Sequence, residues 1–271
     1  MKLLRYALDG SEHIGVLNGG EIIRLGVTAM TELMAEDVAF VDTGIIDNLA
    51  EARIQPPLQP GKILAIGRNY AEHARELDNE VPQEPLVFAV MPSAVIGSGE
   101  MIEWERAITR QVDWEGELAV IIGQTARKVP EAAALKHVFG YTIANDVSAR
   151  DLQTRDKQWT RAKGMDTFCP LGPCVVTADD IPDPQALRIV TAVDGMEKQN
   201  GRTADMIFSV RRLIAHLSRA FTLHPGDIIL TGTPSGVGKA QQPPQFLATG
   251  SRVSITIEPI GTLTNHCRER I

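Results

Sequence analysis

The chain has 271 residues, of which 44% are hydrophobic, and this share is enough for a substantial core and argues against disorder. Its 27 basic and 34 acidic residues give a formal net charge of −7, so we expect neither a nucleic-acid nor a membrane partner. The three cysteines show no CxxC spacing, which favours a reducing compartment over a disulfide framework. Because no signal-peptide pattern opens the chain and no apolar run approaches the ~20 residues of a membrane helix, we expect a cytoplasmic protein.

Residues 1–59 are predicted to form a small N-terminal subdomain, and residues 60–271 a larger catalytic domain. The predicted elements of the small unit are three short strands and two helices, at residues 3–7, 14–17 and 22–25 and at residues 31–36 and 45–52. Three prolines and a glycine within residues 56–61 interrupt regular structure, so this segment is the best boundary in the chain. The small unit contains no cluster of reactive groups, and we assign it a packing role.

Two glutamates on one predicted strand form the first candidate site. The apolar, β-branched run at residues 113–123 indicates a strand, and alternation places Glu115 and Glu117 on the same face, about 7 Å apart. Adjacent carboxylates repel each other, and a hard divalent cation that bridges them relieves the repulsion. Asp146 closes another predicted strand and would be a third carboxylate if the fold brings the two strands together. The alternative is a solvated strand face, on which such glutamate pairs are common.

A histidine and a glutamate share one face of a short predicted helix. Residues 71–77 have helical composition and follow a buried-strand pattern at residues 62–67, and His73 and Glu76 are three residues apart. At that spacing the carboxylate can orient and polarise the imidazole, which then activates water as a general base. The alternative is the charged face of an ordinary surface helix. The polar, proline-containing stretch at residues 71–85 is predicted to be a mobile lid.

An arginine and a glutamine lie three residues apart on a helix that Ser148 is predicted to cap. Arg150 with Gln153 suits a substrate carboxylate or carbonyl, because arginine binds carboxylate bidentately. The alternative for Arg150 is a salt bridge to Asp146 or Asp151.

Three further segments complete the candidate features. Lys163 lies among small residues, where burial would lower its pKa and allow proton transfer, although most single lysines have no such role. Residues 231–238 form a glycine-rich loop with three hydroxyls that can hold a small anion, but the spacing of a P-loop is absent. Residues 169–174 indicate an inert loop with two packing cysteines, and residues 206–221 a core-facing helix.

Four motifs in this order together resemble the fumarylacetoacetate hydrolase family over about residues 62–265. They are Gly67-Arg68-Asn69-Tyr70-Ala71-Glu72-His73, Trp114-Glu115-Gly116-Glu117-Leu118, the run from Asn145 to Gln153, and the run from Thr231 to Gly238. Each motif is weak alone, but the order and the separations are specific. The resemblance therefore favours the functional interpretation of each motif over its structural alternative.

The resemblance implies an α+β, mostly β fold: a mixed β-sandwich roll with peripheral helices, usually in a homodimer. It also assigns a role to each matching residue. The implied metal ligands are Glu115, Glu117 and Asp146, which would bind one Mg²⁺ or Mn²⁺; the implied catalytic residues are His73, Glu76 and Lys163; and the implied substrate-binding residues are Arg68, Tyr70, Arg150, Gln153 and Thr233.

The implied substrate is a small 2-oxo or 1,3-dicarbonyl acid, and the expected reaction is C–C hydrolysis of an acylpyruvate. The alternatives are an oxaloacetate-type decarboxylase, a 2-hydroxyhepta-2,4-diene-1,7-dioate-type isomerase or decarboxylase, and an inactive relative that binds a 2-oxo acid. One departure from the family pattern is Met91, where members often carry lysine or phenylalanine. If this position contacts substrate, the pocket is less cationic than usual.

Overall fold

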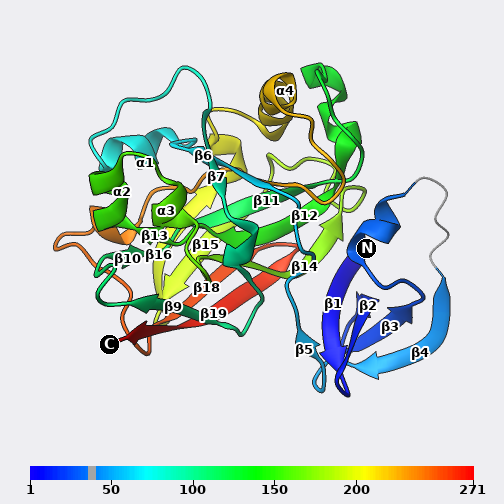
Figure 1. Ribbon diagram of the computed structural model, residues 1–271. Helices are drawn as coiled ribbons and strands as arrows, with labels where there is room; N and C mark the ends of the chain where they lie inside the picture. Colours follow the sequence, from blue (N-terminus) through cyan, green and yellow to red (C-terminus); the bar gives the residue numbers. More distant parts are fainter. Residues whose placement is uncertain (36–40) are drawn as a thin grey trace.

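The computed structural model describes residues 1–35 and 41–271, which fold into mixed β-sheets with helices at the periphery (Figure 1). The largest sheet has the strand order β4 (Asp42–Asn48), β3 (Glu21–Leu25), β2 (Ser11–Asn18), β1 (Lys2–Leu8), β14 (Cys169–Thr177), β12 (Val138–Asn145), β11 (Gly116–Ile122), β17 (Ile228–Leu230), β6 (Ile63–Gly67) and β7 (Leu86–Val90). Beside this path, β5 (Arg53–Ile54) pairs with β1 and β8 (Val95–Ile96) pairs with β14.

A second sheet crosses the lower part of the view in Figure 1 and carries the end of the chain. Its strand order is β16 (Met196–Arg202), β15 (Arg188–Val193), β18 (Arg252–Ile257), β19 (Gly261–Arg270) and β9 (Met101–Glu105), and a separate pair joins β10 (Val112–Asp113) to β13 (Ser148–Ala149). Most pairs are antiparallel, but β17 with β6, β19 with β9 and β14 with β8 are parallel. The predicted fold class, mostly β with mixed sheets, is therefore confirmed.

The helices are short and lie around the sheets. The α-helices are α1 (Ala71–Glu76), α2 (Arg150–Asp156), α3 (Thr160–Lys163) and α4 (Val210–Ala220), and the 3₁₀ helices are η1 (Met30–Met34), η2 (Pro92–Ala94), η3 (Glu131–His137), η4 (Thr203–Asp205) and η5 (Gly238–Ala240). In Figure 1, α1, α2 and α3 gather at one side of the sheets, where the site described below lies. In the part of the chain that the structure describes, no helix has the length and apolarity to cross a membrane.

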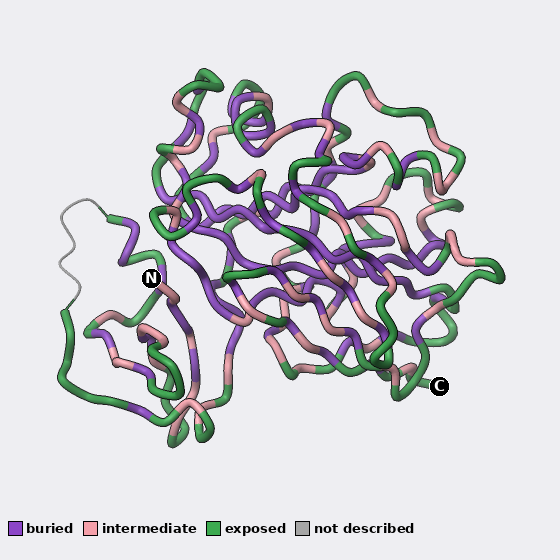
Figure 2. Tube along the Cα trace, turned by 180° about the vertical axis from the view of Figure 1, so that it is seen from behind, coloured by how far each residue is buried: buried purple, intermediate pink, exposed green. Residues whose placement is uncertain are grey.

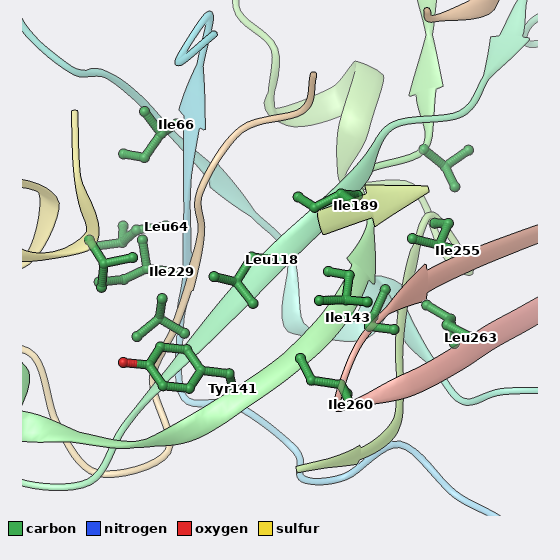
Figure 3. Close-up of a cluster of buried hydrophobic side chains, with 14 of the residues drawn as sticks. Leu64, Ile66, Leu118, Tyr141, Ile143, Ile189, Ile229, Ile255, Ile260 and Leu263 are labelled. Atoms are coloured by element: carbon green, nitrogen blue, oxygen red, sulfur yellow. The ribbon is translucent and has the colours of Figure 1, made fainter. Parts of the chain in front are cut away.

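Strand β11 is the centre of the molecule. All seven of its residues are buried, because β12 and β17 flank its edges and apolar clusters cover both faces. Leu118 and Val120 belong to one hydrophobic cluster, whereas Ala119 and Ile121 belong to the other, as strand alternation requires. Figure 3 shows the first cluster, in which side chains of both large sheets meet, and Figure 2 shows buried backbone running through the middle of the molecule.

One N-terminal helix prediction is wrong. Residues 45–52 are expected to be helical, but β4 forms there instead and pairs with β3. Ile45 and Ile46 are 44% and 62% exposed, so they do not form the apolar stripe of a packed helix, and Asp47 turns inward to bind Arg24. The other helix prediction, residues 31–36, coincides in part with η1, and its last residue lies outside the described residues.

Two other local predictions are corrected. Residues 169–174 belong to β14 rather than to a loop: Pro170 pairs with Ile96 of β8, and Gly172 and Pro173 fall where the pairing with β12 is irregular. Ser148 does not cap α2: its hydroxyl donates to the carbonyl of Asp146 at 2.9 Å, and the residue before the helix is Ala149. The predicted core helix at residues 206–221 begins only at Val210, after the cap residue Ser209.

One strand pair joins the N-terminal unit to the large sheet. In Figure 1, β1 to β4 lie to one side of the main body, and β1 joins the large sheet through β14, with Leu3 opposite Val175. The division of the chain at residue 59 stays a prediction.

Candidate active site

Three buried carboxylates meet where β11 begins and β12 ends. Glu115 directly precedes β11, Glu117 lies within it and Asp146 directly follows β12, and their oxygens lie within 4.8 Å of one another. The register of the two strands, in which Glu117 is opposite Ala144, places these strand ends side by side. The backbone amide of Asp146 also donates to the carbonyl of Glu115 at 2.9 Å. The fold therefore brings the three predicted metal ligands together.

Two buried cations hold this carboxylate cluster. Lys163 Nζ lies 2.8 Å from Glu115 Oε2 and 2.6 Å from Asp146 Oδ2. Arg150 Nη2 lies 2.7 Å from Glu115 Oε1, and its Nε donates to Asp113 Oδ2 at 2.8 Å. The partners of Arg150 are thus Asp113 and Glu115, not the two aspartates considered from the sequence. With Asp113 included, four carboxylates and two cations give the cluster a formal charge of −2.

The crowding changes the acidity of each carboxyl group. Burial acts to raise the pKa of Glu115, but the charges of Lys163 and Arg150 outweigh it and lower this pKa to about 2. Burial, followed by repulsion from Asp146 and Glu115, raises the pKa of Glu117 well above its usual range. For Asp146, burial dominates over the attraction of Lys163 and raises the pKa to about 6. The cluster therefore lacks at least one positive charge that would balance its carboxylates.

An oxygen without a partner shows that the cluster suits a cation. Asp146 Oδ1 is buried, and no group of residues 1–35 and 41–271 donates a hydrogen bond to it. Glu117 Oε2 accepts from the amide of Gly232 at 2.7 Å. A buried carboxylate oxygen without a donor is costly, and a hard divalent cation is the ligand that such oxygens prefer. The donor set and the formal charge both fit one divalent ion.

His73 and Glu76 form the predicted pair on α1. His73 Nδ1 lies 2.7 Å from Glu76 Oε1, and Glu76 Oε2 accepts from the amide of Gly236 at 2.8 Å. Glu76 therefore orients the imidazole and also fastens α1 to the glycine-rich loop that follows β17. His73 itself is buried and lines a cavity that the carboxylate cluster also reaches. The opening of residues 71–85 as a lid stays a prediction.

The cavity has a volume of about 210 Å³, and several predicted residues line it. Besides His73, these are Arg68, Glu115, Asp146, Arg150, Gln153, Lys163 and Thr233. Its volume is below the roughly 300–1,000 Å³ of pockets for drug-sized ligands, so it suits a small molecule.

Two predicted substrate contacts are already engaged within the protein. Gln153 Oε1 accepts from Arg150 Nη1 at 3.1 Å. The Thr233 hydroxyl accepts from Gln199 Nε2 at 2.7 Å and donates to the carbonyl of Gly116 at 2.9 Å. These bonds hold the cavity wall, so both residues can position a ligand with little freedom of their own.

Tyr70 does not belong to the cavity lining. It is 2% exposed, and its hydroxyl receives no partner from the described residues. Burial, and then the negative charge of Glu117, raises its pKa. A substrate contact of Tyr70 therefore stays a prediction.

Met91 lies outside the cavity lining as well, with 45% of its surface exposed. Its side chain consequently does not alter the charge of the cavity, and the expected loss of cationic character does not follow from this position.

Some structurally important residues of the site were not singled out from the sequence. Asp113 accepts from Arg150 and from the amides of Gly238 and Lys239, at 2.7 Å and 3.0 Å for the two amides. Gln199 comes from the other sheet and accepts from the amide of Gly116 at 3.0 Å. Asp113 adjoins the glutamate strand and was detectable there, whereas Gln199 has no local sequence pattern.

The sequence itself relates the chain to known proteins. A family model described as fumarylacetoacetate (FAA) hydrolase, C-terminal, matches residues 62–268, which include every residue of the site described above. The chain belongs to the fumarylacetoacetate hydrolase family. Within this family, the oxaloacetate tautomerase YisK of Bacillus subtilis is 47% identical over 222 residues, which cover 80% of this chain and 74% of the relative. A putative hydrolase of Burkholderia lata is 42% identical over 287 residues and is covered to 99%, as is this chain.

Solved structures of the fumarylacetoacetate hydrolase family share the fold. A fumarylacetoacetate hydrolase from psychrophilic Exiguobacterium antarcticum superposes with a TM-score of 0.91 at 38% identity, and all of both chains is covered. A 2-hydroxyhepta-2,4-diene-1,7-dioate isomerase from Mycobacterium marinum gives a TM-score of 0.86 at 38% identity, with 100% of this chain and 99% of that chain covered. The named members are enzymes, and their names span hydrolysis, isomerisation and tautomerisation.

Proposed function

We propose that this chain is a metal-assisted tautomerase that interconverts the keto and enol forms of a small 2-oxo diacid of the oxaloacetate type. The observation that carries the proposal is the shared cavity: Glu115 and Asp146 of the carboxylate cluster and His73, which Glu76 orients, line the same space of about 210 Å³. The relative with 47% identity is named for this reaction on oxaloacetate, which supports the choice. A small cavity also favours a four-carbon acid over a larger substrate.

Glu115, Glu117 and Asp146 would hold one Mg²⁺ or Mn²⁺, as the unpartnered Asp146 oxygen and the charge of the cluster suggest. When bound, the ion supplies Lewis acidity toward the 2-oxo group. The rest of the chemistry belongs to side chains of the protein.

The imidazole of His73 moves the proton. Glu76 accepts a hydrogen bond from Nδ1–H, which leaves Nε2 as the basic nitrogen. In the keto-to-enol direction, Nε2 takes a proton from C3, the electron pair of the C3–H bond forms the C2=C3 double bond, and the carbonyl oxygen gains a proton. No water is consumed, and no atom is oxidised or reduced.

Lys163 is placed to stabilise the negative charge that develops on the carbonyl oxygen. Its ammonium carries three N–H donors, of which Glu115 and Asp146 use two. The third donor is available to the substrate oxygen, since Lys163 lines the cavity. The proton held by His73 then passes to that oxygen, and the catalyst returns to its starting form.

The test is the decay of enol absorbance after freshly dissolved oxaloacetate is added, with Mg²⁺ or Mn²⁺ supplied. Wild type should accelerate the decay beyond metal alone, and His73→Ala should lower the rate by about 10²–10⁴-fold, the usual value of general acid–base catalysis. His266→Ala, which removes an exposed histidine, is the matched control. No acceleration by wild type would contradict the proposal, and release of pyruvate in step with the decay would indicate a decarboxylase.

Acylpyruvate hydrolysis, the reaction expected first from the sequence, is the second candidate. The His73–Glu76 contact of 2.7 Å supports water activation, and a structural neighbour with a TM-score of 0.91 is named a fumarylacetoacetate hydrolase. Cleavage of an acylpyruvate into two acids by wild type, lost in His73→Ala, would favour this reaction. The predicted homodimer and the choice between Mg²⁺ and Mn²⁺ stay predictions.

A further inference from the structure

Lys239 brings a positive charge to the cavity that the carboxylate cluster does not neutralise. Arg150 and Lys163 both lie within 2.8 Å of carboxylate oxygens, whereas no carboxylate of residues 1–35 and 41–271 forms an ion pair with Lys239. The Nζ atom of Lys239 makes one long contact, 3.5 Å from the hydroxyl of Thr154. Partial burial, and then the charge of Arg150, lowers the pKa of Lys239. An arriving anion would relieve this repulsion, so the ammonium is poised for one.

The backbone of Lys239 is held rigidly although its side chain is exposed. Asp113 accepts from the amides of both Gly238 and Lys239, and the same carboxylate accepts from Arg150. Asp113 is itself fully buried. The position of Lys239 relative to the carboxylate cluster is therefore fixed by a buried group, as a recognition residue requires.

Lys239 and Thr154 line one side of the cavity together, and neither side chain contacts the three carboxylates of the cluster. Arg150 contacts Glu115 at the carboxylate cluster, while Thr154, one turn further along α2, lies beside Lys239. Residues four apart on a helix are about 5–6 Å apart. A short diacid with its 2-oxo acid end at the cluster would have its other end in the same cavity that Lys239 lines.

We propose that Lys239 is a specificity-determining residue that binds the far carboxylate of a 2-oxo diacid. This assignment rests on the proposed function only in one respect, namely that the other end of the ligand is a 2-oxo acid held at the carboxylate cluster. Arg68 is the competing cation, but its guanidinium stacks over the Trp159 ring at 5.8 Å. It therefore has an aromatic partner, whereas Lys239 has none among the described residues.

Two probes differ at the far end, where oxaloacetate carries a carboxylate and its 4-methyl ester a neutral, slightly larger group. We would measure their calorimetric affinity and their KM and kcat with the Mg²⁺-supplemented protein. Lys239→Met should weaken the affinity for oxaloacetate about 10-fold, as expected for loss of a charge-assisted hydrogen bond, and should leave the ester within about twofold. The loss should appear in KM rather than in kcat, and Lys239→Arg should restore most of the affinity.

Lys198→Met is the matched control, because it removes a lysine that bonds Gln245 on the neighbouring stretch of chain and does not line the cavity. Equal effects of Lys239→Met on both probes, no effect on either, or selectivity that is lost in Arg68→Met instead would overturn the assignment. If wild type binds oxaloacetate selectively but does not turn it over, the role of Lys239 is supported and the proposed tautomerase activity is contradicted. Turnover with no selectivity between the probes would support the tautomerase activity and contradict the role of Lys239. Failure of both probes to bind would overturn both proposals.

Discussion

Two buried acidic sites in this molecule differ in their charge balance, and the difference separates structure from function. In the N-terminal unit, Asp47 binds Arg24 through both oxygens, at 2.8 and 2.9 Å, and also accepts from Tyr6, so its charge and its hydrogen bonds are satisfied. At the candidate active site, four carboxylates share two cations, and one oxygen of Asp146 has no partner among the described residues. A balanced network stabilises the fold, whereas an unbalanced one needs a ligand.

The sharpest way to break this comparison is to remove one charge from the unbalanced site. Glu117→Gln should abolish stabilisation by Mg²⁺ or Mn²⁺ and lower turnover about 10³-fold or more, because several kcal/mol of charge stabilisation are lost. The fold should survive, since the substitution relieves repulsion between Glu117 and Asp146. Thermal unfolding with metal and with chelator is the measurement, and Asp47→Asn is the control. A metal-induced shift of wild-type size in Glu117→Gln would contradict the assignment.

Removing the cation from the balanced site should lower the stability of the fold and leave metal binding and turnover unchanged. Arg24→Met leaves the inward-facing Asp47 with Tyr6 alone, so the free energy of unfolding should fall by about 1.5–3 kcal/mol. Metal binding and turnover should be unchanged, because the network lies in the N-terminal unit. Urea unfolding and the enol assay check the two halves of this prediction. An equally large effect on turnover would show that the two sites are coupled.

Acid should weaken the balanced network by protonating Asp47. The hydrogen bond from Arg24 outweighs burial and lowers the pKa of Asp47, so its charged form contributes stability above the unfolded-state pKa of about 3.9. That contribution is lost as the pH falls through the lower pKa of the folded state. The stability gap between wild type and Asp47→Asn should therefore be full at neutral pH and close below about pH 4. A gap that does not change with pH would assign the effect of Asp47 to packing.

The smallest expected effect belongs to the neutral member of the network. Tyr6→Phe removes the hydroxyl that donates to Asp47 and should cost about 0.5–1.5 kcal/mol of unfolding free energy. Burial, and then the hydrogen bond to Asp47, raises the pKa of Tyr6 to about 12. Burial also raises the pKa of Tyr70 and of Tyr141, so all three tyrosines should titrate late, and Tyr6→Phe should remove one of these late groups from the absorbance titration. Titration of all tyrosines in a single early step would contradict the network.

The sequence yields these candidate site residues because short local motifs carry them. Glu115 with Glu117, and His73 with Glu76, are set by strand and helix periodicity, and the structure places each pair as that periodicity requires. The bridge from Asp113 to Lys239 was not predictable in the same way. It joins residues more than a hundred positions apart, and no local period encodes such a contact.

The fold was predictable to the extent that its strands are apolar and regular. The short strands at residues 3–7, 14–17 and 22–25 and the buried strand at residues 62–67 were expected and are present as β1, β2, β3 and β6. Strand β4 was missed because it lies at the edge of its sheet with exposed isoleucines, and β14 because its prolines resemble a loop. In both cases the partner strand decides the structure, and pairing between distant segments cannot be recognised from a local window.

The parallel pair of β6 and β17 has a consequence for the biosynthesis of the chain. Ile63 on β6 pairs with Ile228 on β17, and β17 also covers one edge of β11. Until the ribosome has released residue 230, β11 therefore has an open edge lined by isoleucine and valine. Such exposed edges associate with other chains, and long-range pairs form slowly. We expect nascent chains that stop before β17 to need a chaperone and to aggregate without one.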